Sequence, residues 1–446
     1  MKNLALWIWL AQKCGAGNAE MAALVERMGS IENVYEADFD TYTDEGASER
    51  LAEDLCDKRL DDANQIIAFC QAHKIGILCY DDPRYPLALR SISNPPAVLY
   101  YQGILPDFNK GLFVSIVGTR KMSEYGMGAA YKIAYEVASS GAFVVSGMAL
   151  GIDGVAAAAS IEAGGRTVAV LGCGVDEIYP KEHGILKDKI RQNGVILSEF
   201  APGTEPRGSH FPIRNRIISG LSQATVVVDA DIGSGAMITA KCAILQGRDI
   251  YAVPSNIGSV NSSGTNSLIR DGAQAVLCGK DIVKNYTFAY KDRLSLGRMY
   301  ASEERSALDV SVLTRLGMRL AKDFAPKAEM PKQEAKPRVH KSAAPDKKPE
   351  GGAKPETVKQ ESAYERAIMA NGKPWEKETD NSQAALASLG EKQRLVFDEI
   401  PLDFPVTVDR LTTHTGLKLG EVMSALTVLE IKGLVVSLPG AIYMRK

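Results

Sequence analysis

The chain has 446 residues, with 52 Lys and Arg against 54 Asp and Glu, and its formal net charge is −2. At about 150 residues per domain, this length predicts about three domains. The balanced charge excludes a uniformly basic nucleic-acid-binding protein, so a site for a polyanion has to arise from local placement of cations. Hydrophobic residues make up 45% of the chain, enough for a sizeable core.

Cysteine usage indicates a reducing compartment. The seven cysteines are an odd number, and the chain has neither a C-x-x-C pair nor an H-E-x-x-H motif. The sequence therefore predicts no disulfide framework, no zinc site and a cytoplasmic location. The apolar run from Leu4 to Ala11 superficially resembles the core of a signal peptide, but it falls far short of the ~18 apolar residues of a membrane span. We interpret it as a first core helix and expect no membrane association.

Residues 1 to 80 show apolar positions at helical spacing, and we expect a helical N-terminal domain over residues 1–74. Residues 1 to 80 contain 14 acidic and 7 basic side chains. Between two helical runs, the turn Cys14-Gly15-Ala16-Gly17 resembles a helix-hairpin-helix, whose backbone N–H groups can hold a phosphate. The surrounding acidity favours a structural or protein-contact role for this domain over DNA contact.

From Leu112 to Cys278, short β-branched runs alternate with helical segments; the runs are LFVSIVG, AFVVSG, TVAVLG, VILSE, ATVVVDA, DIYAVP and AQAVL. Apolar strands separated by helices indicate an α/β fold with a parallel, doubly wound, Rossmann-like sheet. The proline-rich segment from Ile75 to Gly103 leads into this sheet. We place the core domain at residues 75–290.

Residues 291–383 are expected to be a largely disordered linker, since positions 326 to 360 are rich in Pro, Lys and Glu and poor in aliphatic residues. Residues 384–446 then show the order of a winged helix: a helix from Glu391 to Ile400, the run VTV, two further helices and two short strands. The second of these helices, the one expected to read DNA, carries acidic as well as basic residues. This mixture favours contact with a protein over contact with duplex DNA, which stays open as the alternative.

A doubly wound sheet binds its ligands beyond the carboxyl ends of its strands, so the residues after each strand are the candidate site. Three such loops are Gly118 to Arg120, Ser146 to Gly154, and Gly172 to Lys181. The chain lacks both the dinucleotide fingerprint G-x-G-x-x-G after the first strand and the P-loop motif, so no nucleotide cofactor is expected. Ser146 and Ser219 lack a sequence-evident His partner, and Asp153 fits a helix cap better than a general base.

Basic residues are dense in these loops and at the starts of the following helices, which indicates a site for several phosphates. They are Arg120, Lys181, Arg207, His210, Arg214, Arg216, Lys241 and Arg270. Three aromatic side chains in the same loops, Tyr125, Tyr179 and Phe211, could stack on bases.

Seven motifs of this region occur in the order and spacing of a known family: SIVGTR-x-x-S-x-YG, VVSGMALGID, AVLGCGVDEIYP, ILSEF-x-PG, FPIRNRIISGLS, GSGAMITA and G-x-N-x-LI-x-x-GA. They resemble the DNA-processing protein A family (DprA, also called Smf) over about residues 75 to 280. The stretch Val253-Pro254-Ser255-Asn256 departs from it, because the family typically has Gly after Pro. The resemblance implies a protein without catalytic turnover and without a cofactor. Such a protein binds single-stranded DNA, forms a dimer through its core and helps load the RecA recombinase during natural transformation.

The resemblance also implies roles for individual residues. Arg120 and Lys181 would be the principal phosphate-binding cations, and backbone N–H groups of the loops after the first two strands would add donors. The full set of DNA-binding residues is Gly118, Thr119, Arg120, Ser146, Gly147, Lys181, Arg214, Asn215, Arg216 and Lys241.

Two other functions compete with this interpretation. The central fold also resembles nucleoside-monophosphate phosphoribohydrolases, whose active site contains P-G-G-x-G-T and a downstream Glu. Here the corresponding stretch, Gly233 to Ala240, has neither. The second alternative is a regulator that binds duplex DNA through residues 384–446.

Overall fold

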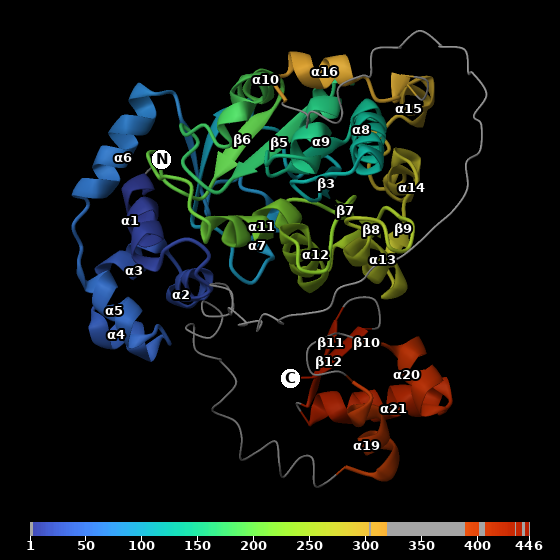
Figure 1. Cartoon of the computed structure of the whole chain (residues 1–446). Helices are drawn as coiled ribbons and strands as arrows, with labels where there is room; N and C mark the ends of the chain where they lie inside the picture. Colours follow the sequence, from blue (N-terminus) through green and yellow to red (C-terminus); the bar gives the residue numbers. More distant parts are fainter. Residues whose placement is uncertain are drawn as a thin grey trace, which may run out of the picture. The chain divides into compact units, whose positions relative to one another are not determined.

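The computed structural model describes residues 3–302, 305–318, 389–400, 406–432, 434–438 and 442–445 (Figure 1). The chain divides into two compact units, Met1–Phe324 and Ala325–Lys446. Each is described by itself.

The first unit begins with six helices, as the apolar spacing predicts. They are α1 (Leu4–Cys14), α2 (Glu20–Met28), α3 (Ile31–Glu36), α4 (Phe39–Asp44), α5 (Glu49–Cys56) and α6 (Asp61–Ala72). Ser30 and Asp38 cap α3 and α4 by accepting hydrogen bonds from backbone N–H groups of the first turn. The apolar run at the start of the chain is α1, whose Trp7 and Trp9 are buried. The prediction of a core helix there is confirmed.

The central sheet has nine strands in the order β1-β2-β6-β5-β4-β3-β7-β8-β9. Their bounds are β1 (Gly76–Cys79), β2 (Val98–Gly103), β3 (Phe113–Val117), β4 (Phe143–Ser146), β5 (Arg166–Leu171), β6 (Val195–Ser198), β7 (Ala224–Val227), β8 (Asp249–Ala252) and β9 (Gln274–Ala275). The seven strands expected from the β-branched runs are all present and parallel to one another.

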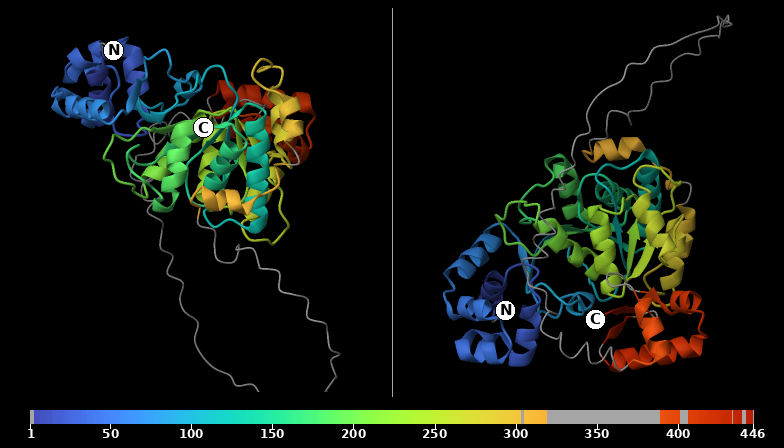
Figure 2. Two further views of the ribbon diagram at one scale, coloured as in Figure 1. Left: turned by 90° about the horizontal axis from the view of Figure 1, so that it is seen from above. Right: turned by 60° about the horizontal axis from the view of Figure 1, so that its bottom comes forward.

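One edge of the sheet differs from the expectation of a purely parallel sheet. Strands β1 and β2 pair antiparallel with each other, and β2 pairs antiparallel with β6. Residues Gly76–Cys79, in the segment expected to lead into the sheet, therefore extend it as strand β1. Its antiparallel end lies on the side of the N-terminal helices (Figures 1 and 2).

Helices cover both faces of the sheet, which confirms the doubly wound, Rossmann-like class (Figure 1). One face carries α8 (Glu124–Ser139), α9 (Ile152–Glu162) and α10 (Gly184–Asn193). The other carries α7 (Leu87–Arg90), α11 (His210–Gly220), α12 (Gly235–Leu245) and α13 (Ser263–Arg270). The strand order reverses between β3 and β7, so the crevice expected to hold a ligand lies at the carboxyl ends of these strands.

The segment after the sheet corrects the start of the expected linker. Beyond α14 (Gly279–Val283), the helices α15 (Leu296–Ala301) and α16 (Val310–Arg315) are folded elements. Met299, Val312 and Leu313 are buried in the same apolar cluster as α8 and α9. Residues 291–302 and 305–318 therefore belong to the core, because their apolar side chains find partners there. Residues 319–383 of the expected linker lie outside the described residues.

The second unit has the winged-helix order that the sequence predicts. It comprises α19 (Glu391–Asp398), β10 (Val406–Thr407), α20 (Val408–Thr415), α21 (Leu419–Ile431), β11 (Val435–Leu438) and β12 (Ile442–Arg445). The strand order is β10-β12-β11. Leu411, Val422, Leu426 and Leu429 form the centre of a separate small core.

Among the helices of the described residues, none combines the length and the apolar character that a membrane crossing requires.

Candidate functional site

The candidate site lies where the loops after β3, β4 and β5 meet the start of α11. Three of the loop motifs and the FPIRNR segment, which lies within α11, converge here, because carboxyl ends of parallel strands share one edge of the sheet.

The exposed Arg120 side chain and the half-buried rings of Tyr179 and Phe211 form the outer part of this site. The ring of Phe211 stacks on that of Tyr179 at a centroid distance of 5.3 Å, with 29° between the planes. The guanidinium carbon of Arg120 lies 5.2 Å from the centre of the Phe211 ring. A Cβ atom at Gly172 would lie 3.0 Å from Phe211, so the small residue there makes room for the ring. We call Arg120, Tyr179 and Phe211 the Phe211 platform.

Arg120 is exposed to solvent, and so is Lys181, which follows Tyr179 by two residues and begins a short 3-10 helix (Lys181–His183). The structure thus places both principal predicted cations on the surface, in the segments that supply the platform. An exposed guanidinium over an aromatic ring can pair with a phosphate and support a stacked base.

Arg214 differs, because it is buried and points inward. Its Nη1 donates hydrogen bonds to the carbonyl oxygens of Gly147, at 2.8 Å, and of Val170. Burial lowers the pKa of Arg214 to about 10, while the nearby Asp153 carboxylate acts in the opposite direction. Arg214 therefore braces the ends of β4 and β5 from beneath the platform: its guanidinium carbon lies 5.9 Å from the centre of the Phe211 ring, but the side chain is buried.

The same brace uses the backbone N–H group of Gly147, which was expected to contact DNA. It donates to Asp153 Oδ2 at 3.0 Å and is not available to a phosphate. Asp153 lies in the first turn of α9 and is buried, and this burial raises the pKa of its carboxyl group. The Asp153 side chain organises the loop after β4 and does not cap the helix: α9 begins after Gly151 without a side-chain cap, so the expectation of a helix cap at Asp153 is wrong.

Arg216 and Asn215, also of the FPIRNR segment, are buried as well. Arg216 Nη2 lies 2.6 Å from Glu199 Oε1, and the side chain of Asn215 donates to the carbonyl oxygen of Gly235 at 3.3 Å. Neither side chain is placed to contact an external strand. The resemblance implies that Arg214 and Arg216 support the phosphate-binding cations, but both side chains are engaged inside the core.

The loop that presents Arg120 is held by a residue the sequence analysis did not single out, Asp229 at the end of β7. The Asp229 carbonyl oxygen accepts from the N–H group of Thr119 at 2.6 Å, and its carboxylate accepts from that of Ser123 at 2.7 Å. Burial raises the pKa of the Asp229 carboxyl group. The sequence contains one signal for Asp229: it follows β7, one of the two strands between which the strand order reverses, and residues in that position face the ligand crevice.

The other predicted residues lie around this centre. Gly118 packs so closely against Ile152 that a Cβ atom would lie 2.5 Å from that side chain. The hydroxyl of Ser146 donates to the carbonyl oxygen of Ile116 at 2.9 Å and serves the sheet. Lys241 is exposed on α12.

The site shows no catalytic constellation within the described part of the chain. The Ser219 hydroxyl is buried and donates to backbone carbonyls of its own helix, as the Ser146 hydroxyl donates to the sheet. No group of three or more His, Cys, Asp or Glu side chains able to hold a metal ion occurs among the described residues. The arrangement is suited to holding an anion and a planar ring.

The fold and this site define a Rossmann-like protein whose carboxyl-edge loops present cations and an aromatic surface to an anionic ligand. Comparison with known proteins supports this class: the DNA recombination-mediator protein A family matches residues 76–287, and the DprA winged helix domain matches residues 380–441. The DNA processing protein DprA of Bacillus subtilis is 40% identical over 218 residues, which cover 49% of this chain and 73% of that protein. The chain belongs to the DprA family, whose members are also named Smf.

Two further relatives support the assignment. Protein Smf of Synechocystis is 37% identical over 278 residues, which cover 61% of this chain and 70% of that protein. The X-ray structure of DprA from Streptococcus pneumoniae aligns with a TM-score of 0.56 at 32% identity, covering 63% of this chain and 97% of that one.

Proposed function

We propose that this protein binds single-stranded DNA at the Phe211 platform. The observation that carries the proposal is the exposed Arg120 guanidinium over the Phe211 ring, which is itself stacked on Tyr179. Single strands are bound through phosphate contacts together with stacking of bases on aromatic rings, and the platform offers both. Lys181, in the loop after β5, extends the cationic surface, and Lys241 is a further exposed cation on α12.

The cellular role we propose follows from family membership. The chain acts in the cytoplasm, without catalytic turnover, protecting incoming DNA and helping to load the RecA recombinase during transformation or recombination. The names of the relatives, which refer to DNA processing, support the DNA part of this proposal. The helices of residues 1–74, the core of 75–290 and the winged helix of 384–446 are proposed as its separate functional parts.

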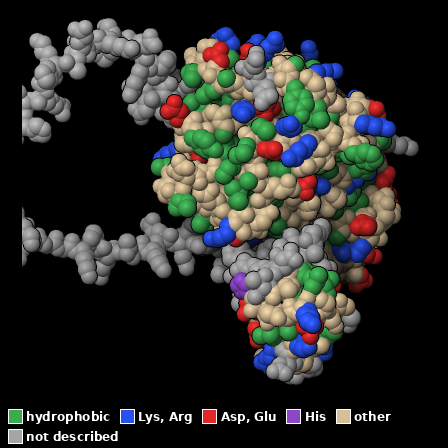
Figure 3. Space-filling model, turned by 90° about the vertical axis from the view of Figure 1, so that its right-hand side faces the viewer, with side chains coloured by type: hydrophobic (Ala, Val, Ile, Leu, Met, Phe, Trp, Pro, Cys, Tyr) green, Lys and Arg blue, Asp and Glu red, His purple; other side chains and the backbone are tan. Residues whose placement is uncertain are grey.

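We also propose that the core forms a homodimer. Large apolar side chains are exposed around β9: Leu277 follows the strand and is 68% exposed, and Tyr125 and Val260 are 54% and 75% exposed. Figure 3 views the side of the molecule that carries β9 and α14 in Figure 1, and apolar side chains are spread over that face among charged ones. Exposed apolar side chains such as Tyr125 and Leu277, which line one surface pocket beside α8, favour burial against a partner. A twofold dimer would join two modest cationic surfaces into one longer track.

The DNA proposal is tested by the salt dependence of binding. Each phosphate contact releases counterions, so Arg120→Ala or Lys181→Ala should weaken binding to all single-stranded sequences. Each loss should also flatten the slope of log K against log [salt] by about 0.7 to 1. Fluorescence anisotropy with an oligothymidine and a mixed-sequence strand between low and high salt measures both quantities.

Arg166→Ala is the matched control, because Arg166 is an exposed arginine at the first residue of β5 and so lies at the opposite, amino edge of the sheet. Its loss should change affinity and slope little. Wild-type affinity and slope in both Arg120→Ala and Lys181→Ala, with the fold intact, would show that DNA does not bind here.

A further inference from the structure

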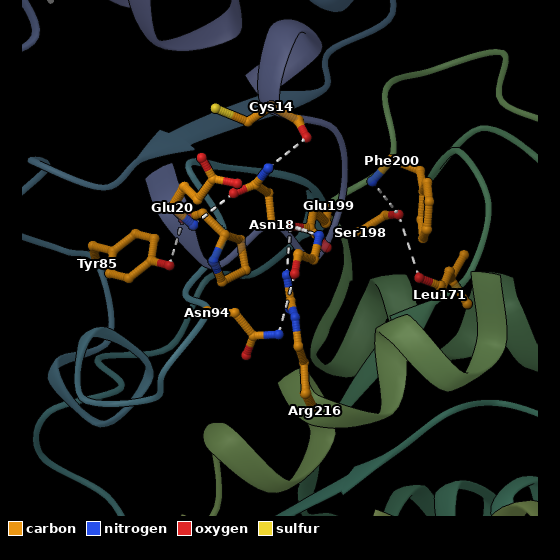
Figure 4. Close-up of polar contacts among 12 residues, drawn as sticks. Cys14, Asn18, Glu20, Tyr85, Asn94, Leu171, Ser198, Glu199, Phe200 and Arg216 are labelled. Carbon is orange, nitrogen blue, oxygen red and sulfur yellow. Dashed lines mark hydrogen bonds and ion pairs between the residues drawn. The ribbon is translucent and has the colours of Figure 1, made fainter. Parts of the chain in front are cut away.

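The hairpin between α1 and α2, whose amides could have held a phosphate, is instead docked on a carboxylate of the core. The backbone N–H group of Gly17 donates to Glu199 Oε1 at 3.2 Å, and the side chain of Asn94 donates to the Gly17 carbonyl oxygen at 3.2 Å. Figure 4 shows Asn94, Glu199 and Arg216 converging below the hairpin, which runs from Cys14 to Asn18. The N-terminal helices thus meet the core through a specific polar contact.

The core side of this contact is a buried ion pair. Glu199 follows β6, Arg216 lies in α11, and their side chains are only 8% and 6% exposed. Among the described residues, Oε2 of Glu199 and both Nε and Nη1 of Arg216 lack hydrogen-bond partners. A buried pair with unsatisfied atoms is costly, and removing one member leaves an uncompensated charge. Gly17 adds a second donor to Glu199 Oε1, the oxygen that Arg216 also contacts, so undocking of the hairpin would leave this buried carboxylate with one donor fewer.

The segments that carry Glu199 and Arg216 also carry residues that pack beside or form part of the Phe211 platform. Phe200, next to Glu199, stacks its ring on that of His210 at 4.2 Å with 17° between the planes. His210 begins α11 and precedes Phe211. On the same helix, Ile213 packs against the hairpin so closely that a Cβ atom at Gly17 would lie 2.8 Å from its Cγ2 atom. One helix thus contacts the hairpin, the ion pair and the platform.

We propose that Gly17, Glu199 and Arg216 form a latch through which docking of the N-terminal helices sets the position of the Phe211 platform. Glu199 and Arg216 are positioning residues in this role and touch no DNA themselves. The inference rests on the proposed function, because its consequence is that the N-terminal helices raise the affinity for single-stranded DNA without contributing a phosphate contact.

Two glycines of the hairpin provide a matched test in the full-length chain. Gly17 and Gly15 both have positive φ angles, +79° and +75°, so a side chain strains the backbone at both positions, and at Gly15 the ψ of 163° makes that strain substantial. A Cβ atom at Gly17 collides with Ile213, whereas a Cβ atom at Gly15 meets nothing within 4 Å. Comparing Gly17→Ala with Gly15→Ala therefore isolates opening of the latch from backbone strain.

Gly17→Ala should raise hydrogen–deuterium exchange in residues 199–213 and lower the affinity for an oligothymidine by about fivefold or more. The slope of log K against log [salt] should stay at the wild-type value, because no phosphate contact is lost. Gly15→Ala should leave exchange and affinity as in the wild type. The second variant is Glu199→Gln, which keeps the shape of the side chain and removes its charge. It should change exchange and affinity in the same direction as Gly17→Ala. Thermal unfolding verifies that each variant is folded.

Three results would overturn the latch: faster exchange in residues 199–213 with unchanged affinity, a slope flattened as in Arg120→Ala, or unchanged exchange in both Gly17→Ala and Glu199→Gln. If the wild type bound no single-stranded DNA, the proposed function would be wrong. The latch could then not act by raising the affinity for DNA. The exchange data would still show whether the hairpin and the start of α11 are coupled.

Discussion

His183 ties the segment that begins with Lys181 to the loop after β4. Its ring is buried, and Nδ1 donates to the carbonyl oxygen of Met148 at 3.0 Å. Burial lowers the pKa of His183, although the Met148 carbonyl and the charges of Asp153 and Glu182 act in the opposite direction. The folded chain therefore binds the proton of this imidazole less tightly than the unfolded chain does.

The free energy of unfolding should accordingly fall as the pH drops below about 6.5, where the unfolded imidazole takes up its proton. The loss attributable to His183 is at most about 1.4 kcal/mol per pH unit, and it ends at the lowered pKa of the folded state. Urea unfolding of the wild type and of His183→Gln at pH 7.5 and 5.5 measures it. We expect a smaller pH-dependent loss in the variant; equal losses in both proteins would contradict this assignment.

Burial also explains why only part of the site could be predicted from the sequence. Arg120 comes shortly after β3 and Lys181 lies at the end of the longer loop after β5, and these loops were expected to be exposed. Arg214 and Arg216 share a basic motif with no sign of burial, because the carboxylates near them, those of Asp153 and Glu199, come from other elements. Local sequence shows that a cation follows a strand. Whether it faces solvent or an internal carboxylate depends on tertiary packing.

At the scale of the elements, α16 shows where the core ends. Leu313 is fully buried against the α8 and α9 side of the sheet, and the next residue, Thr314, is exposed. Leu313→Ala should lower the free energy of unfolding by about 2–4 kcal/mol, because it removes buried methyl groups and leaves a cavity. Thr314→Ala, on the same helix, is the control and should change it by less than about 1 kcal/mol.

Urea unfolding measures both variants. A change below about 1 kcal/mol in Leu313→Ala would mean that α16 adds little to the core and that residues 291–318 behave as the linker expected from the sequence.

The central parallel strands were predictable because they are short β-branched runs buried on both faces, as in β3, β6 and β7, whereas β9 at the edge of the sheet is exposed. The antiparallel edge was not, since β1 and β2 flank a proline-rich segment and β2 reaches β6 across a long sequence separation. Likewise, α15 and α16 are helices of only six residues each. Their place in the core depends on contact with the α8 and α9 side of the sheet, which the local sequence does not reveal.

At the scale of the whole molecule, a net charge near zero is compatible with a polyanion site, because acidic and basic side chains are concentrated in different parts of the chain. The first 80 residues hold twice as many acidic as basic side chains, and the exposed cations Arg120 and Lys181 lie at the carboxyl edge of the sheet. Inside the core, Arg216 is paired with Glu199. The charge that matters for a ligand is therefore the exposed charge at one edge of the sheet.

In the winged helix, the exposed side chains bear on whether this domain binds a protein or duplex DNA. The helix expected to read DNA is α21, and Lys392 and Glu421 form an ion pair at 2.6 Å between α19 and α21. Glu421 also accepts from the backbone N–H group of Lys418 at 2.9 Å. Two apolar side chains of α21, Leu419 and Met423, are 55% and 38% exposed. A face with apolar and acidic groups suits a protein partner better than a phosphate backbone.

Residues 384–446 alone should therefore bind duplex DNA no more tightly than non-specific contacts allow, with Kd of about 10⁻⁴ M or weaker at physiological salt. The fragment is suitable for the test, because the described residues of this unit have an apolar core of their own. Anisotropy titrations with several duplexes, with the full chain and a single strand as the positive control, measure the difference. Sequence-selective binding of a duplex at submicromolar concentration would instead establish the regulator alternative. The exposed apolar and acidic groups of α21 cannot supply such affinity, so side chains elsewhere in the domain would have to read the bases.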